Sequence, residues 1–131
     1  MKNHLNQPGR KPKPILNIAV DCGSLSAPLR ERGGISTLTY NLLVMLGKID
    51  QRNKYIFYSY SPLNKNLLVK YAGRAKNIVL PKIGFFKVWL PLALKINKSD
   101  AFFALSQSVP ANAPSTLGFI YDLAFFRFRK M

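Results

Sequence analysis

Two glycines and two aspartates mark the places in this sequence where chemistry is expected. Asp21 ends an apolar run, Ile15 to Val20, in a chain of 131 residues that has only five acidic residues. Gly33 and Gly34 precede a segment with helical spacing, and the free backbone N–H groups at the start of a helix favour anions. Asp122 follows Tyr121 at the end of a later apolar run. The chemistry that this pattern suggests is recognition of an anionic ligand.

Other catalytic chemistries lack the residues they need. Cys22 is the single cysteine and His4 the single histidine, so an intramolecular disulfide is impossible. His/Cys metal sites and Ser-His-Asp catalysis are disfavoured for the same reason. We therefore expect neither a metal nor a cofactor, interpret Cys22 as a packed thiol, and assign no catalytic residue.

Short apolar runs alternate with helical patterns along the chain, which predicts an α/β fold. The predicted strands are 15–20, 55–60, 77–80, 101–105 and 116–121, and the predicted helices are 36–48, 63–72 and 85–96. This order predicts a Rossmann-like parallel sheet of about five strands with helices on both faces. We expect the strand from Ile15 to lie in its interior, between those from Tyr55 and Ala101.

Ligands of such sheets bind beyond the carboxyl ends of the strands, so the candidate residues should converge on one edge. They are Asp21, Gly33, Gly34, Ser106 and Asp122. Simpler interpretations stay open at this point. In these interpretations, the aspartates do no more than cap loops, and the glycines do no more than form a turn.

Two helices have patterns that bear on packing. In the first, the apolar residues predict the buried face: Leu38, Leu42, Met45, Leu46 and Ile49. The segment from Phe85 to Lys98 mixes aromatic and aliphatic residues with lysines, which is typical of a membrane-surface helix. Alternatively, its apolar side packs on the sheet. Pro91 predicts a kink there, or a helix that begins later than Phe85.

The net charge of +15 is large, and its lysines and arginines are spread over nearly every segment. This spread disfavours nucleic acid, whose binding sites concentrate basic residues, and leaves anionic membranes and phosphorylated substrates as candidate partners. Residues 1–14 predict a disordered basic leader without a signal-peptide core, and 15–131 a single domain. No run is long and apolar enough to span a membrane, so we expect a cytoplasmic location. A peripheral position at the inner face of the membrane is an alternative.

In the run IAVDCGSLSAPLRERGGISTLTYNLLVMLGKIDQRNKYIFYS, a strand that ends in an acid is followed by a loop with Gly-Gly, a helix and a Tyr/Phe-rich strand. This order resembles the start of the N-terminal domain of family 4 glycosyltransferases, which have the GT-B fold. DAFFALSQSVP resembles its Asp-Val-Phe-His segment, and SVPANAPSTLGFIYDLAFFRF the region that runs into a His-Asp-Leu strand end. The resemblance covers Ile15 to Arg129.

The resemblance implies a retaining hexosyltransferase that transfers a sugar from a nucleotide-sugar to an acceptor in polysaccharide or glycolipid synthesis. It implies that Gly33 and Gly34 lie near the donor phosphate and sugar, and that Asp21, Ser106, Tyr121 and Asp122 line the acceptor side of the cleft. Tyr121 stands where the family has histidine, and tyrosine can hydrogen-bond a sugar hydroxyl but cannot replace histidine as a base at neutral pH. The family's donor-binding C-terminal domain has no counterpart here, so we expect a truncated domain that is inactive alone. The alternative is a non-catalytic basic module that binds a membrane surface or a partner protein.

Overall fold

The structure is a computed structural model that describes residues 13–26, 33–105, 109–110 and 112–118. Parallel strands alternate with helices along this part of the chain. The elements are β1 (Asn17–Asp21), the 3₁₀ turn η1 (Gly23–Leu25), α1 (Gly34–Ile49), β2 (Lys54–Ser59), α2 (Lys65–Val69), β3 (Ala75–Val79), the π-helical turn η3 (Phe85–Trp89), α3 (Leu90–Ile96), β4 (Ala101–Ala104) and β5 (Ser115–Gly118).

The five strands form one sheet in the order β3-β2-β1-β4-β5, and every neighbouring pair is parallel. β1 lies in the interior, with Ile18 opposite Tyr55 of β2 and Ala101 of β4. The order reverses at β1, because the chain runs outward through β2 and β3 and then returns to its other side. The predicted Rossmann-like α/β fold and the interior place of β1 are confirmed.

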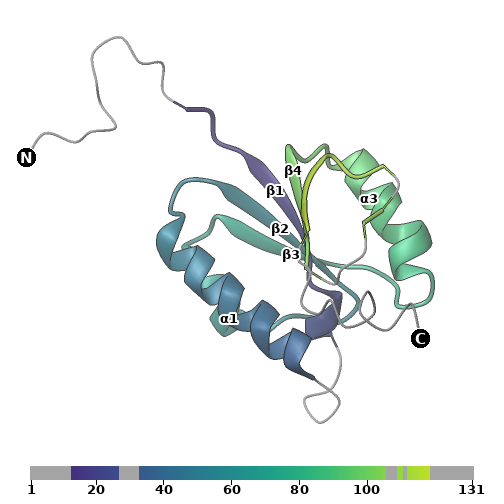
Figure 1. Ribbon diagram of the computed structural model, residues 1–131, viewed down its shortest axis with the longest axis horizontal. Helices are drawn as coiled ribbons and strands as arrows, with labels where there is room; N and C mark the ends of the chain where they lie inside the picture. The colour runs from purple at the N-terminus through teal and green to yellow at the C-terminus, as the bar shows by residue number, and fades with distance from the viewer. Residues whose placement is uncertain (1–12, 27–32, 106–108, 111, 119–131) are drawn as a thin grey trace, which may run out of the picture.

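Helices cover both faces of the sheet, as predicted (Figure 1). On one face, Leu43 of α1 and Leu67 of α2 pack with Val20 and Phe57 of the central strands. On the other, α3 packs through Leu90, Ala93 and Leu94 against Ala19 and Phe102. Since successive residues of a strand point to opposite faces, β1 contributes to both cores and reads as a continuous apolar run.

The predicted buried face of α1 is wrong. Leu38, Met45 and Ile49 are exposed and Leu42 and Leu46 are only half-buried, whereas the helix buries Ser36, Thr39, Leu43 and Gly47. The reason is that α1 lies very close to the buried ring of Tyr71. A Cβ on Gly47 would lie 3.1 Å from the Tyr71 ring, and the Tyr71 hydroxyl donates to the Leu43 carbonyl at 2.6 Å. Small residues therefore face inward so that the helix can lie on this buried ring.

Most strands and helices differ from the prediction by one or two residues at their ends, and the larger or functionally relevant differences are in α2, β3 and β5. α2 is shorter, at Lys65–Val69, and β3 begins two residues early, at Ala75. The described part of β5 is Ser115–Gly118.

The side chain of Asn77, inside β3, donates to Phe57 O at 2.8 Å and accepts from Leu63 N at 3.0 Å, so it joins β3 to the loop that opens α2.

Pro91 has the predicted effect. Regular α-helix begins only at Leu90, with Pro91 in its first turn. Before it, Trp89 N donates to Gly84 O at 3.1 Å and Leu90 N donates to Phe85 O, each five residues back. This wider π-helical turn spares the carbonyl of Lys87 the clash that a proline ring causes in a regular helix.

Asp50 fastens the end of α1 to β2 and β3. Its carboxylate accepts from the backbone N–H groups of Arg52 and Asn53, at 3.0 and 3.1 Å, and from the hydroxyl of Tyr55. Its carbonyl accepts from the Arg74 guanidinium at 2.7 Å. Partial burial opposes ionisation, but these hydrogen bonds outweigh it and lower the pKa of Asp50 from its ordinary 3.8 to about 2.

This gives a pH-dependent contribution to stability. Because the folded-state pKa is lowered, the contribution is complete above about pH 4 and is lost as pH falls through about 2. Asp50→Asn should cost about 1 kcal/mol at neutral pH, the net worth of a typical hydrogen bond, and should flatten the acid limb of the stability curve. Urea unfolding between these pH values measures both, and an unchanged acid limb in the variant would contradict the assignment.

Candidate functional site

Asp21 closes β1 at the carboxyl edge of the sheet, where the prediction placed it. The side chain is only 1% exposed. Its Oδ1 accepts a hydrogen bond from Gly23 N at 2.9 Å, so the carboxylate turns the chain from β1 into η1. This geometry supports the loop-capping interpretation and makes Asp21 a positioning residue, since its exposure is too small for direct contact with a ligand in this conformation.

Gly23 packs against this carboxylate, and a side chain there would force its neighbours to shift. A Cβ there would lie 3.1 Å from Asp21 Oδ1 and 3.2 Å from Phe85 Cε1. Phe85 opens η3, so this glycine lets the β1 loop and the start of η3 meet. The sequence prediction overlooked Gly23, although a small residue two positions after a strand-ending acid is a signal for such a turn.

Gly33 and Gly34 open α1, as predicted. Gly33 caps the helix in extended backbone, and its carbonyl accepts from Thr37 N at 3.3 Å. Neither glycine has a positive φ. A Cβ on either would meet no atom of the described residues within 4 Å. Neither backbone conformation nor packing among the described residues therefore requires glycine here, and both residues are exposed.

Buried hydroxyls connect η1 to the first two turns of α1. Ser36 and Thr39 are nearly or fully buried, and Ser24 Oγ lies 3.4 Å from Thr39 Oγ1. The prediction missed these three residues. Their signal was the spacing of Ser36 and Thr39, which places two short polar side chains on the helix face that follows the glycine pair.

A second set of hydrogen bonds fixes the loop after β2 against η1. Tyr60 N donates to Ser26 Oγ at 3.0 Å, and Ser61 Oγ donates to Ser26 O at 3.0 Å. Ser59 Oγ donates to Ser61 O at 2.7 Å. The carboxyl ends of β1 and β2 are thus held as one unit beside the start of α1.

Cys22 lies in this unit but is unsuited to nucleophilic chemistry. It is buried, and its backbone N–H continues the sheet by donating to Tyr58 O at 2.8 Å. Burial, and then the adjacent Asp21 carboxylate, raise the pKa of the Cys22 thiol well above its ordinary value. The thiol is therefore protonated at neutral pH, as expected for a packed cysteine.

The remaining predicted site residues, Ser106, Tyr121 and Asp122, lie outside the described residues. The strands that precede them do end at the expected edge, because β4 and β5 run parallel to β1. Among the predicted residues, Asp21 and the Gly33–Gly34 pair lie on elements that meet, because η1, which follows Asp21, contacts α1, which the pair opens.

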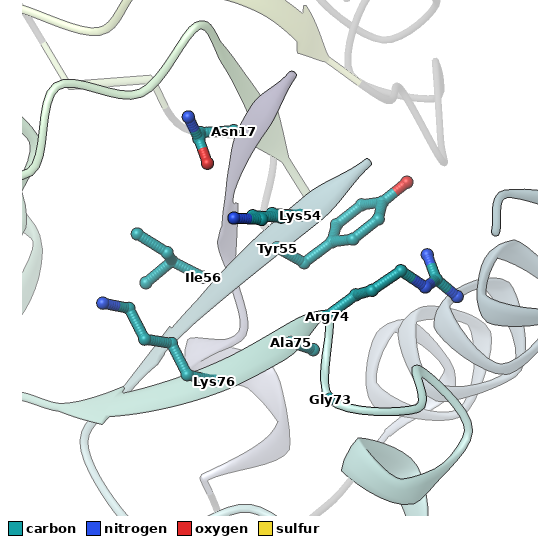
Figure 2. A pocket seen from close by; sticks show the side chains of 8 residues that line it. All are labelled: Asn17, Lys54, Tyr55, Ile56, Gly73, Arg74, Ala75 and Lys76. Carbon is teal, nitrogen blue, oxygen red and sulfur yellow. The ribbon is translucent and has the colours of Figure 1, made fainter. Parts of the chain in front are cut away.

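A basic cavity of about 340 Å³ opens at the opposite, amino edge of the sheet (Figure 2). Its lining includes Lys54, Lys76 and Arg74. Figure 2 shows Arg74 pointing away from the two lysines, and its guanidinium donates to Asp50 O and Asn53 O at 2.7 and 3.2 Å. Arg74 therefore holds the end of α1 and is not presented to a ligand, so this cavity is the weaker candidate.

Two further features are absent from the part of the chain that the structure describes. No group of three or more His, Cys, Asp or Glu residues could hold a metal ion there. No helix within the described ranges is long and apolar enough to cross a membrane.

Comparison with known proteins gave no match: no family model, no curated protein and no solved structure matches the chain.

The two kinds of glycine at this edge should respond differently to alanine. Gly23→Ala should destabilise the fold by about 1–3 kcal/mol, the usual cost of overpacking, because Asp21 and Phe85 are both buried. Gly34→Ala should leave stability unchanged or raise it by up to about 1 kcal/mol through helix propensity. Urea unfolding of both variants tests this, and equal destabilisation would mean that Gly34 also serves the fold.

Proposed function

We propose that the chain is the acceptor-side, N-terminal portion of a retaining GT-B glycosyltransferase, which transfers a sugar from a nucleotide-sugar to an acceptor in polysaccharide or glycolipid synthesis. The fold class, the reversal of strand order at β1 and the order of the sequence motifs support this proposal. Ligands of such sheets bind beside that reversal, where β1 meets the start of α1.

The observation that carries the proposal is the glycine pair. Gly33 is the N-cap, a position where glycine is common, but Gly34 is the first residue of the helix, where glycine costs stability relative to alanine. At Gly34 the usual two reasons fail, since φ is not positive and a Cβ would meet no atom of the described residues within 4 Å. A ligand that must approach the backbone closely is a third reason, and a diphosphate suits the first-turn amides of a 16-residue helix.

These amides would act on the leaving group. In sugar transfer, the bond between the anomeric carbon and the phosphate oxygen breaks, a bond from the acceptor hydroxyl to that carbon forms, and the hydroxyl proton passes to a phosphate oxygen of the departing nucleoside diphosphate. Negative charge grows on the departing nucleoside diphosphate. Fixed N–H donors aimed at that charge stabilise it more in the transition state than in the ground state.

Asp21 and its surroundings would shape the acceptor side. The Asp21–Gly23 hydrogen bond and the Ser26 contacts fasten the described part of the loop after β1, residues 22–26, to the end of β2. Ser24 and Thr39 tie that loop to α1. Such preorganisation keeps an acceptor hydroxyl and a donor phosphate at a constant separation, which is where much of the rate enhancement of a transferase arises.

Nucleotide binding by the chain tests the proposal. Isothermal titration calorimetry with UDP as probe should give weak binding, of the order of 1 mM in Kd, as expected for one wall of a cleft. Gly34→Val should weaken this binding at least about tenfold, equivalent to about 1.4 kcal/mol, because its side chain blocks the approach to the amides while the fold persists.

The matched control is the double variant Lys54→Gln and Lys76→Gln, which removes two positive charges at the amino edge. It should bind UDP nearly as well as the wild type. If instead the control loses binding and Gly34→Val keeps it, the nucleotide is held by general basic charge, and the non-catalytic module is the better description.

The isolated chain should also lack turnover. The resemblance assigns most donor contacts to a domain that has no counterpart in this sequence. Incubation with common nucleotide-sugars and saccharide acceptors should therefore release no nucleoside diphosphate above the rate of spontaneous hydrolysis. Turnover of the order of 1 s⁻¹, typical of complete enzymes, would contradict this division of labour.

A further inference from the structure

The segment from Ile83 to Lys98 has apolar residues on two sides, only one of which faces the sheet. Phe85, Leu90, Ala93 and Leu94 are buried against it. The solvent side carries a second set of apolar residues, which we call the outer strip: Ile83, Val88, Trp89, Leu92 and Ile96. The two readings of this segment from the sequence are therefore not exclusive, since one side packs on the sheet and the other remains uncovered.

The π-helical turn creates this second side. From Phe85 to Leu90 the buried residues are five positions apart, so three consecutive residues, Lys87 to Trp89, are left facing solvent. A regular helix would return to the sheet after three or four residues. Val88, Leu92 and Ile96 then follow at intervals of four, in line along the outside.

Local contacts hold Ile83 and Trp89 together at the N-terminal end of the outer strip. Trp89 Nε1 donates to Ile83 O at 3.0 Å. Gly84 has a φ of 73°, and its Cβ position is within 3.5–3.8 Å of Val88 and Trp89. The turn is therefore folded back on the helix, so that Ile83, which is 89% exposed, extends the strip.

Positive charge surrounds the outer strip. Lys82, Lys87, Lys95 and Lys98 are exposed on the same segment. The sequence has no Asp or Glu between residues 51 and 99, so no carboxylate of this part of the chain offsets them. An uncovered apolar strip bordered by cations needs an occupant that is both apolar and anionic.

We propose that the outer strip binds the surface of an anionic lipid membrane. The aliphatic side chains would enter the boundary between headgroups and acyl chains, the indole of Trp89 suits that boundary, and the lysines would meet lipid phosphates. A second copy of the chain is a poor occupant, because two surfaces of this charge repel each other. The proposal does not depend on the glycosyltransferase assignment.

Trp89 makes the test direct, because it is the single tryptophan of the chain. Its emission should shift to shorter wavelength when the protein is titrated with vesicles of phosphatidylcholine and phosphatidylglycerol, and much less with phosphatidylcholine alone. Raising NaCl from about 0.05 to about 0.5 M should weaken binding at least about tenfold, since the Debye length then falls to a few ångströms.

A matched pair of variants locates the surface. Leu92→Ser with Ile96→Ser removes side chains that are 45% and 69% exposed on the outer strip. The control, Leu38→Ser with Ile49→Ser, removes side chains that are 46% and 75% exposed on α1, on the opposite face of the sheet. The first variant should bind anionic vesicles at least about tenfold more weakly, whereas the control should bind like the wild type.

The double variant Lys87→Gln with Lys95→Gln provides a second test that leaves packing untouched. This variant should lose affinity for anionic vesicles and keep its weak response to neutral ones. Circular dichroism melting confirms that each variant folds. The proposal is overturned if the Trp89 emission of the wild type does not respond to anionic vesicles, if neutral vesicles bind equally well, or if the α1 control loses as much binding as the strip variant.

Discussion

β1 is hydrogen-bonded along both edges and covered on both faces, and the other elements are placed by that constraint. Its neighbours β2 and β4 satisfy its backbone groups. Val20 belongs to the core under α1 and Ala19 to the core under α3. Because β1 is buried on both faces, the residues that follow it leave the sheet at its carboxyl edge, which is also the edge where α1 begins. The position of the candidate site follows from that exit.

The fold class was predictable because a buried parallel sheet leaves a plain signal, short apolar runs spaced by helices. The buried face of α1 was not. Apolar periodicity reports hydrophobicity, whereas the inward face was decided by how closely the helix must approach Tyr71, which favours Gly47 over a leucine. The effect of Pro91 was predictable in kind, but the π-helical turn that exposes Trp89 depends on keeping both Phe85 and Leu90 on the sheet.

At the candidate site, sequence reasoning found the residues that interrupt a pattern, the strand-ending Asp21 and the Gly33–Gly34 pair. It overlooked Gly23, Ser24 and Thr39, whose sequence signals are weak because their roles depend on contacts between segments distant in sequence, such as the approach of Phe85 to Gly23. Nor could it show that Asp21 is turned inward. Because Asp21 is buried, the candidate ligand contacts are the backbone amides at the start of α1 and not the Asp21 carboxylate.

Nuclear magnetic resonance of the labelled chain during titration with a nucleotide-sugar tests the central claim most directly, because it reports where on the sheet the ligand lies. The account predicts that the largest amide shifts occur at the carboxyl edge, at Gly33 to Ser36 and in η1. Shifts confined to the amino-edge cavity, around Lys54 and Lys76, or no shifts at saturating ligand, would contradict it.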